Sequence, residues 1–353
     1  MKLLAPFFML AALVFGGTVY TWTDMGTHQG ASTGANGLNN NGEVVGVFSS
    51  GSGFHAWKYS GGVFTDMGTM GGIISEANAI NNSGQITGRS QIANGNEVAF
   101  VHQGGLFTNI GSLGGVSTIG QGINENGWVT GYADTANSGA YQTFLYNGTS
   151  FVALNSLGGG SGQGIDVNAS GWVTGGSYTA GGQFHAFVWD GVTMIDLGTM
   201  GGVYSIGRGI NDAGQVAGYL VDSSGNFHGF LYTPGVGMAD IGMLGTQFTF
   251  ARAINSAGWV TGNSANASFQ NRAFVYDGTT MQDMNLLSFV TPLPTVLTVS
   301  FGINDVGQII ANGDDGKAYL LTPVGGDVPE PGTWAMMTMG LAGVAWRARR
   351  YRG

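Results

Sequence analysis

Residues 161–197 read SGQGIDV-NASG-WVTGGS-YTAGGQ-FHAFVW-DG-VTMIDL, a series of short apolar runs separated by turns. The turn Asn168-Ala-Ser-Gly171 has the Asn and the Gly that a type I turn prefers at its first and fourth positions. Asp190-Gly191 between two apolar runs is a strong hairpin signal. The stretch therefore predicts four short strands, at Ser161–Val167, Trp172–Ser177, Phe184–Trp189 and Val192–Leu197.

Three landmarks of this stretch recur along the whole chain, with gaps of 42 to 49 residues. The glycine of the Asn-x-x-Gly turn falls at Gly42, Gly84, Gly127, Gly171, Gly214, Gly258 and Gly307. The strand motif whose most complete copy reads His-Ala-Phe begins at His55, Val98, Gln142, His185, His228, Arg272 and Lys317. The motif Asp-Leu-Gly begins at Asp24, Asp66, Asn109, Ala153, Asp196, Asp240 and Asp283. Because each landmark occurs seven times, the chain consists of seven internal repeats.

Four strands and about 43 residues per unit predict an all-β fold, a seven-bladed β-propeller, whose blades run about 40–45 residues. The chain starts in mid-unit, because Val19–Met25 is a fourth strand without the first three. It also ends in mid-unit, since Phe301–Thr322 supplies only the first three strands. Pairing the two fragments would close the ring and remove the exposed strand edges. An open β-solenoid is the alternative fold.

The composition excludes several classes of protein. Of 353 residues 66 are Gly, only 9% are charged and none is Cys, so long helices, disulfides and thiolate metal sites are not expected. The stretch from Val19 to Val328 has six basic and nineteen acidic residues, a net charge of −13. Such a surface repels nucleic acid, which is bound through Lys and Arg. Cations, neutral sugars and basic partners suit it better.

Both ends of the chain have the pattern of targeting segments. Lys2 followed by the apolar run Leu3–Val14 is too short for a membrane span and fits the start of a signal peptide, here assigned to residues 1–18. The propeller is expected at 19–323 and a linker at 324–332. Residues 333–353 form a hydrophobic segment and a basic cluster, Arg347, Arg349, Arg350 and Arg352.

The C-terminal tail contains Val328, Pro329, Glu330 and Pro331, followed by the apolar run Thr333–Trp346 and the terminal arginines. With these features in this order, the tail resembles the PEP-CTERM sorting signal of Gram-negative bacteria. In that family an exosortase, a membrane protease-transpeptidase, acts near the Pro-Glu-Pro motif. The resemblance implies export, a transmembrane C-terminal helix that anchors the chain transiently in the inner membrane, and a final place at the cell surface or outside the cell.

The repeats resemble the extracellular HAF repeat over roughly residues 20–322. The residues that carry this resemblance are FHAFVW at 184–189, MIDLGTMGG at 194–202 and GINDAGQVAGY at 209–219. Members are typically exported and have no assigned biochemical activity. The resemblance therefore implies cellular location and shape rather than chemistry.

Two columns of repeated polar residues are interpreted as structural. His55, His185 and His228 occupy one repeat position on a middle strand, where three copies cannot converge on one ion. The Asp column, Asp24, Asp66, Asp196, Asp240 and Asp283, fits acceptors of backbone N–H groups at strand ends. No catalytic residue, metal ligand or cofactor is assigned, and calcium is kept as the one open alternative.

Three tryptophans are the candidate ligand-binding residues. Trp128, Trp172 and Trp259 directly follow the Asn-x-x-Gly turn in three units. Aromatic faces at a rim of the disc would stack on sugars. The alternative reading of all three is packing between blades.

These observations favour an exported, non-catalytic binding or scaffold module of the cell surface or extracellular matrix, associated with exopolysaccharide or biofilm. The alternative is a propeller-type polysaccharide-degrading enzyme, a glycosidase or lyase. The enzyme would need non-repeating polar residues that converge at one end of the central channel. The longest gap between repeats contains the insert Leu286–Val299, where such asymmetry is first expected.

Overall fold

The computed structural model describes residues 18–27, 30–136 and 140–325, and this part of the chain folds almost entirely into β-strands. A single turn of 3-10 helix, η2 (Met284–Leu286), interrupts them. Among these residues no helix has the length and apolar character to cross a membrane. Residues 1–17 of the expected signal peptide, the motif at 328–331 and the expected membrane helix with its arginine cluster lie outside the described residues.

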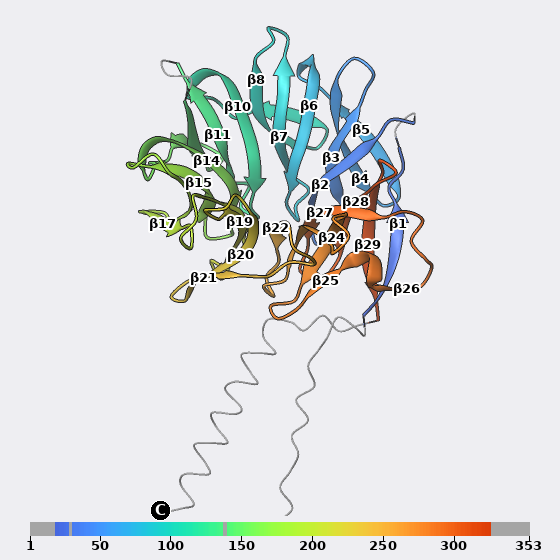
Figure 1. The fold of residues 1–353 in the computed structure, drawn as a ribbon. Coiled ribbons are helices and arrows are strands. Elements are labelled where there is room, and N and C mark those ends of the chain that lie inside the picture. Colours follow the sequence, from blue (N-terminus) through green and yellow to red (C-terminus); the bar gives the residue numbers. More distant parts are fainter. Residues whose placement is uncertain (1–17, 28–29, 137–139, 326–353) are drawn as a thin grey trace, which may run out of the picture.

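The strands follow one another in groups of four, antiparallel within each group (Figure 1). Their bounds are, in the first three groups, β2 (Thr33–Leu38), β3 (Val44–Ser49), β4 (Phe54–Ser60), β5 (Val63–Gly68); β6 (Gly71–Ile80), β7 (Ile86–Ile92), β8 (Glu97–Gln103), β9 (Leu106–Asn109); β10 (Gly114–Ile123), β11 (Val129–Thr135), β12 (Tyr141–Tyr146) and β13 (Phe151–Ala153).

The next three groups have the same order of strands. Their bounds are β14 (Gly158–Val167), β15 (Val173–Thr179), β16 (Phe184–Trp189), β17 (Met194–Gly198); β18 (Tyr204–Ile210), β19 (Val216–Val221), β20 (Phe227–Thr233), β21 (Gly237–Asp240); β22 (Thr249–Ile254), β23 (Val260–Ala265), β24 (Asn271–Tyr276) and β25 (Met281–Asp283). The strands expected from residues 161–197 are therefore observed as β14 to β17, with bounds shifted by at most three residues.

The last group combines the two ends of the described chain. β27 (Leu297–Ile303), β28 (Ile309–Gly313) and β29 (Ala318–Val324) are joined by the N-terminal strand β1 (Val19–Asp24), which pairs antiparallel with β29 from Val19↔Val324 to Asp24↔Tyr319. The short β26 (Ser288–Phe289) runs parallel to β1 on its other side. The prediction that the N-terminal strand completes the unit left unfinished at the C-terminus is confirmed by this pairing.

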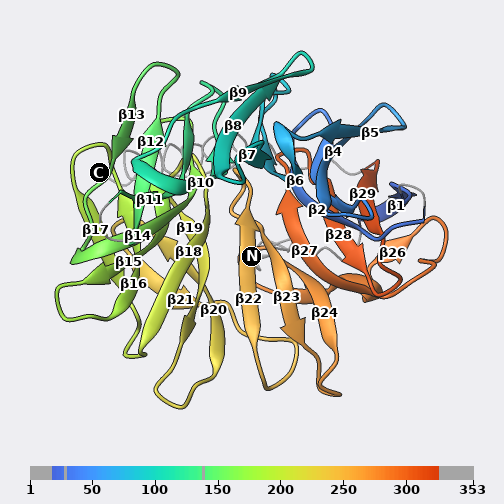
Figure 2. The same ribbon diagram turned by 90° about the horizontal axis from the view of Figure 1, so that it is seen from above.

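Neighbouring groups meet at few backbone positions. Single parallel pairs, Phe54↔Ile74, Glu97↔Ser117 and Phe184↔Tyr204, connect some of them, so the strands form sheets of five, twelve, eight and four. Seen from above, the groups stand around a common centre, with the first strand of each group innermost (Figure 2). The first strands therefore supply the side chains at the centre of the molecule.

The core lies between adjacent groups. The third strands supply one fully buried phenylalanine ring in each of five groups: Phe100, Phe144, Phe187, Phe230 and Phe274. Each belongs to a separate apolar cluster that also takes residues from a neighbouring group, as when Phe144 packs with Ala99 and Ile110. Stability is thus distributed over a series of small cores, as is usual for repeat proteins.

Candidate functional site

The asparagine of each Asn-x-x-Gly turn links its unit to the next. Asn39 Nδ2 donates to the carbonyl of Asn81, and the same contact is repeated by Asn81, Asn124, Asn168, Asn211, Asn255 and Asn304, at distances of 2.8 to 3.2 Å. The last of these bonds runs from Asn304 to Asn39, so the series returns to its first member. We call these residues the asparagine ring. All are at most 5% exposed, so each amide replaces water as the partner of a buried carbonyl.

An apolar layer lies next to the asparagine ring. It consists of the residue that precedes each asparagine: Leu38, Ile80, Ile123, Val167, Ile210, Ile254 and Ile303. This layer, the collar, separates a hollow of about 360 Å³ beside the ring from a larger cavity of about 450 Å³ on the other side. The larger cavity is within the size range of small-molecule sites.

A β-bulge in the first strand of every group supplies the lining of the larger cavity. In β2 the register with β3 passes from Ala35 to Gly37 and skips Asn36. The residues skipped in this way are Asn36, Asn78, Gln121, Ile165, Arg208, Arg252 and Phe301. Each stands two residues before the collar and lines the cavity. Bulges re-aim side chains and are frequent beside functional sites. The bulge residue is therefore the position at which the repeats differ chemically.

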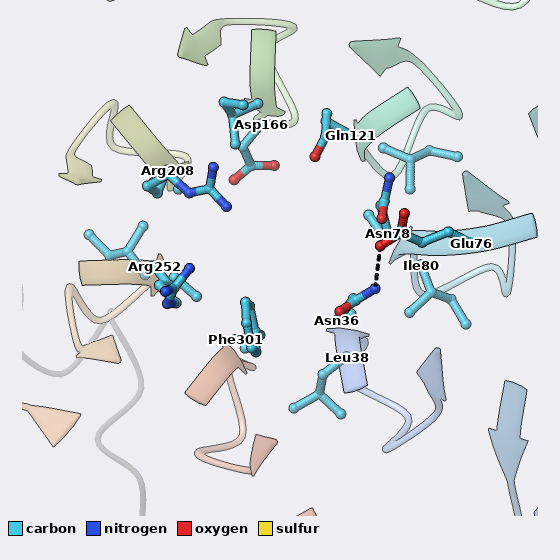
Figure 3. A pocket seen from close by; sticks show the side chains of 18 of the residues that line it. Asn36, Leu38, Glu76, Asn78, Ile80, Gln121, Asp166, Arg208, Arg252 and Phe301 are labelled. Carbon is cyan, nitrogen blue, oxygen red and sulfur yellow. Dashed lines mark hydrogen bonds between the residues drawn. The ribbon is translucent and has the colours of Figure 1, made fainter. Parts of the chain in front are cut away.

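One side of the cavity presents amides, as Figure 3 shows. Asn36, Asn78 and Gln121 form what we call the amide face. Asn36 Nδ2 donates to the carbonyl of Ala77 at 3.1 Å, and Asn78 Nδ2 donates to that of Gly120 at 2.8 Å. Both side-chain oxygens remain available to a ligand as hydrogen-bond acceptors.

Glu76 and Arg89 flank the amide face as an ion pair. Arg89 Nε donates to Glu76 Oε2 at 3.0 Å, and its Nη1 donates to Glu97 at 3.2 Å. Burial acts to lower the pKa of Arg89, but these two carboxylates raise it above its ordinary value. Each charge on this side thus has an oppositely charged partner within the protein.

The opposite side of the cavity presents two guanidinium groups. Arg208 and Arg252, with Phe301, form what we call the arginine face (Figure 3). The guanidinium of Arg252 lies 4.7 Å from the centre of the Phe301 ring, in cation–π contact, and its Nε donates to Asn263 Oδ1 at 2.9 Å. Burial, and then the charge of Arg208, lower the pKa of Arg252 to about 10.

Asp166 points into the cavity between the two faces (Figure 3). It stands directly after a bulge, where the other repeats have Gly or Ala. Its Oδ1 accepts from the N–H of Val167 at 2.8 Å, and its Oδ2 accepts from that of Ile210 in the next unit at 3.0 Å. Burial nevertheless raises the pKa of this carboxyl to about 6. Asp166 is therefore able to take up or release a proton near neutral pH.

The three candidate tryptophans lie between units. A Cβ atom on Gly171 would collide with the Trp128 ring, and one on Gly214 would lie 2.8 Å from Trp172. Trp259 is partly buried against the core cluster that contains Tyr20 and Leu321. The structure does not bring these rings together at one surface, and none of them lines the larger cavity. Their contacts are those of packing residues, and ligand binding by them stays a prediction.

The His and Asp columns pair with each other in the outer half of three units. His55 Nδ1 bonds to Asp66 at 3.1 Å, and His185 and His228 pair in the same way with Asp196 and Asp240. Lys317–Asp24 and Arg272–Asp283 occupy the equivalent places. The aspartates also accept N–H bonds from the residue two positions later, as Asp66 does from Gly68. Such bonds within the protein are those of structural residues, and the structural interpretation of both columns stays a prediction.

The insert at 286–299 does not reach the cavity. β26 pairs with β1, and the Trp22 Nε1–H donates to the carbonyl of Thr291. No residue of the insert lines the larger cavity. The expectation that asymmetry is concentrated there is wrong, because the insert packs on the outer strand. The asymmetry comes instead from the bulge residues, whose signal in the sequence is one variable position three residues before the asparagine of each Asn-x-x-Gly turn.

Comparison with solved structures shows a propeller-like all-β fold. The chain is similar to a catalytically inactive virginiamycin B lyase from Staphylococcus aureus solved with quinupristin, with a TM-score of 0.53, 12% identity, 86% of this chain and 100% of that one covered. It is similar to YCF48 from Cyanidioschyzon merolae, with a TM-score of 0.53, 11% identity, and 86% and 99% covered. The β-propeller domain of the Trilobed protease from Pyrococcus furiosus also matches, with a TM-score of 0.44, 9% identity, and 73% and 98% covered. At such identities the likeness concerns the fold alone.

The tail matches a known sorting signal. The PEP-CTERM protein-sorting motif matches residues 327–350. The chain is thus exported and processed as an exosortase substrate, in the manner of Gram-negative bacteria. No curated protein matches the chain.

Proposed function

We propose that the chain is an exported, closed seven-bladed β-propeller of HAF repeats that acts as a binding module at the cell surface or in the extracellular matrix. Two contacts support closure: β1 pairs with β29, and Asn304 donates to Asn39. The proposed layout is a signal peptide at 1–18, the propeller at 19–323, a linker at 324–332 and a sorting segment at 333–353. Before processing, that last segment would hold the chain in the inner membrane.

The single observation that carries the binding function is the lining of the larger cavity. The repeats agree at the asparagine ring and at the collar, yet the bulge position is filled by amides, an Ile, two arginines and a Phe. A position that only filled space in a symmetric repeat would be expected to hold similar residues in each unit. Amides, arginines and an aromatic ring are the groups that bind sugar hydroxyls, charges and C–H faces. The proposed ligand is exopolysaccharide.

Co-sedimentation with polymer tests this proposal. The detergent-solubilised full chain is mixed with the exopolysaccharide of its source organism, with and without calcium, and the pelleted fraction is measured. We expect retention, strong loss of retention with Gln121→Ala combined with Phe301→Ala, and no loss with Trp128→Ala combined with Trp172→Ala. Loss only in the tryptophan variant would move the site to those rings, and no retention of the parent chain would contradict the proposal.

Processing by exosortase has its own test. Glu330→Ala changes the Pro-Glu-Pro motif and leaves the propeller untouched. We expect the variant to stay in the inner-membrane fraction at its full mass, whereas the parent chain is shortened and leaves that fraction. Equal shortening of both would show that cleavage does not depend on this motif.

An enzymatic function is the second candidate, and Asp166 is the observation that favours it. A buried carboxyl with a pKa raised to about 6, in a cavity that two arginines also line, has the properties of a general acid. A polysaccharide lyase or glycosidase would release unsaturated or reducing ends from the bound polymer. Release that Asp166→Asn abolishes, with polymer binding retained, would favour this candidate over the binding module.

A further inference from the structure

The arginine face holds the uncompensated positive charge of the described protein. Between residues 19 and 325 the chain has six basic side chains other than histidine, and four have a carboxylate within 4 Å: Lys58 with Glu43, Arg89 with Glu76, Arg272 with Asp283, and Lys317 with Asp24. Among the described residues, Arg208 and Arg252 have no such partner. The two unpaired cations are thus neighbours in a single cavity, while residues 19–328 as a whole have a net charge of −13.

This arrangement is unfavourable without a further partner. The charge of Arg208 is close enough to lower the pKa of Arg252. Arg208 Nε is buried and has no hydrogen-bond partner in the described part of the chain. Burying a cationic donor without a partner costs free energy, and two like charges side by side add to the cost. An anion between the two guanidinium groups would relieve both penalties, because arginine forks bind planar carboxylates with two parallel hydrogen bonds.

The rest of the cavity indicates what the anion is attached to. The amide face, Asn36, Asn78 and Gln121, lies opposite the arginine face and is suited to hydroxyl groups (Figure 3). The side chain of Gln121 lines the cavity and has no hydrogen-bond partner among the described residues, so its amide is available to a ligand. The cavity of about 450 Å³ is large enough for a small ligand with both kinds of group.

We infer that the larger cavity binds a uronate, a sugar acid whose carboxylate lies on Arg208 and Arg252 and whose hydroxyls face the amide face. This inference rests on the proposed function and specifies its ligand. Because the acidic body repels a densely charged polymer, the ligand we expect is a single uronate within a mostly neutral polysaccharide. Asp166 lies between the two faces, where its carboxyl would form a hydrogen bond with a hydroxyl of the bound sugar.

Calorimetric titration of the detergent-solubilised full chain at pH 7 tests the inference. The probes are sodium glucuronate, sodium galacturonate, their neutral counterparts glucose and galactose, and inorganic phosphate. We expect at least one uronate to bind tenfold or more tightly than its neutral counterpart and than phosphate. Arg208→Gln and Arg252→Gln should each weaken that binding at least tenfold. Arg208→Lys, which keeps the charge and loses the planar fork, should weaken it less than Arg208→Gln.

Arg272→Gln is the matched control, because it removes the same charge from an ion pair, with Asp283, that does not line the cavity. It should bind the uronate as the parent chain does. Equal binding of glucose and glucuronate, equal binding of phosphate and glucuronate, or full uronate binding by both Arg→Gln variants would each overturn the inference. Retention of polymer without any binding of free uronates would overturn it as well, while leaving the proposed function intact.

Discussion

Gln121 lies in β10 and Asn124 directly follows that strand, so the two amides are three residues apart on opposite sides of the collar. Their side chains are chemically similar but have different roles. Asn124 donates to Asn168 of the next unit and accepts from the N–H groups of Asn126 and Trp128. Gln121 is skipped by the strand register and lines the larger cavity. The asparagine makes the same bond to the next unit in every repeat, whereas the bulge position makes such a bond at Asn36 and Asn78 and holds residues of other kinds in the other repeats. A bulge residue contributes nothing to the ladder, so it is free to differ.

The asparagine ring and the bulge residues depend on the same strand backbone, and we expect substitutions in that backbone to destabilise the protein most. Gly131 of β11 faces Gly120 of β10 beside the bulge, and a Cβ atom there would collide with the carbonyl oxygen of Ile119. We expect Gly131→Ala to lower the free energy of unfolding by about 3 kcal/mol or more, because the bulge has to shift. Urea denaturation followed by circular dichroism measures this. Gly181→Ala, at an exposed site with space for a methyl group, is the control and should change little.

The variants Asn124→Ala and Gln121→Ala compare how much the asparagine ring and the bulge position contribute to the free energy of unfolding. Loss of Asn124 leaves a buried carbonyl and two N–H groups without partners, so we expect about 2–4 kcal/mol of destabilisation. Gln121→Ala should cost less than about 0.5 kcal/mol, as at an exposed site. The same denaturation experiment checks both. Similar costs for the two variants would contradict the division of roles between them.

Asp166 is the bulge-side group whose effect on stability depends on pH. Its carboxyl has a pKa of 3.8 in the unfolded chain and of about 6 in the folded one, so the folded state binds the proton more tightly. The stabilisation is present below pH 4 and is lost as the pH rises to about 6. We expect the midpoint of thermal unfolding to fall over this window, and Asp166→Asn to reduce the fall. A variant with the parent's full pH dependence would show that another group is responsible.

The outer His–Asp pairs should give the smallest effect. Burial acts to lower the pKa of His228, but its bonds to Asp240 and Asp222 raise it above 6.5. Because the folded pKa is the higher one, the stabilisation is present below pH 6.5 and is lost as the pH rises through the folded pKa. At a partly exposed pair we expect less than about 1 kcal/mol. Unfolding of His228→Gln at pH 6 and pH 8 measures it, and an equal deficit at both values would argue against an ionic contribution.

The fold was predictable because turns and periodicity are local signals. Asn168-Ala-Ser-Gly171 and Asp190-Gly191 mark the turns, and Val19–Met25 completes the unit that Phe301–Thr322 begins. The pairing of His with Asp also has a signal within the chain. The unit with Val98 has Asn109, and the unit with Gln142 has Ala153, so the two columns change together.

The cavity was not predictable from alternation along the strand. A bulge breaks the period of two that assigns side chains to faces, so Arg208 and Arg252 could not be placed at the centre. The tryptophans attracted attention because large rings near turns resemble exposed binding residues. In the structure Trp128 covers Gly171 and Trp172 covers Gly214 of the following unit. Only the packing between units reveals this, and no pattern within one unit encodes it.

The pairing of β1 with β29 also sets the orientation of the molecule. Val19 and Val324 are directly opposite each other, and Thr322 Oγ1 accepts a bond from Gln308, which follows the turn of Asn304. Both ends of the described chain therefore leave the propeller-like body on the side of the asparagine ring. The larger cavity lies beyond the collar, on the other side. A body tethered to an envelope through its C-terminal end would turn its invariant side toward that envelope and hold the variable side out to the surrounding medium.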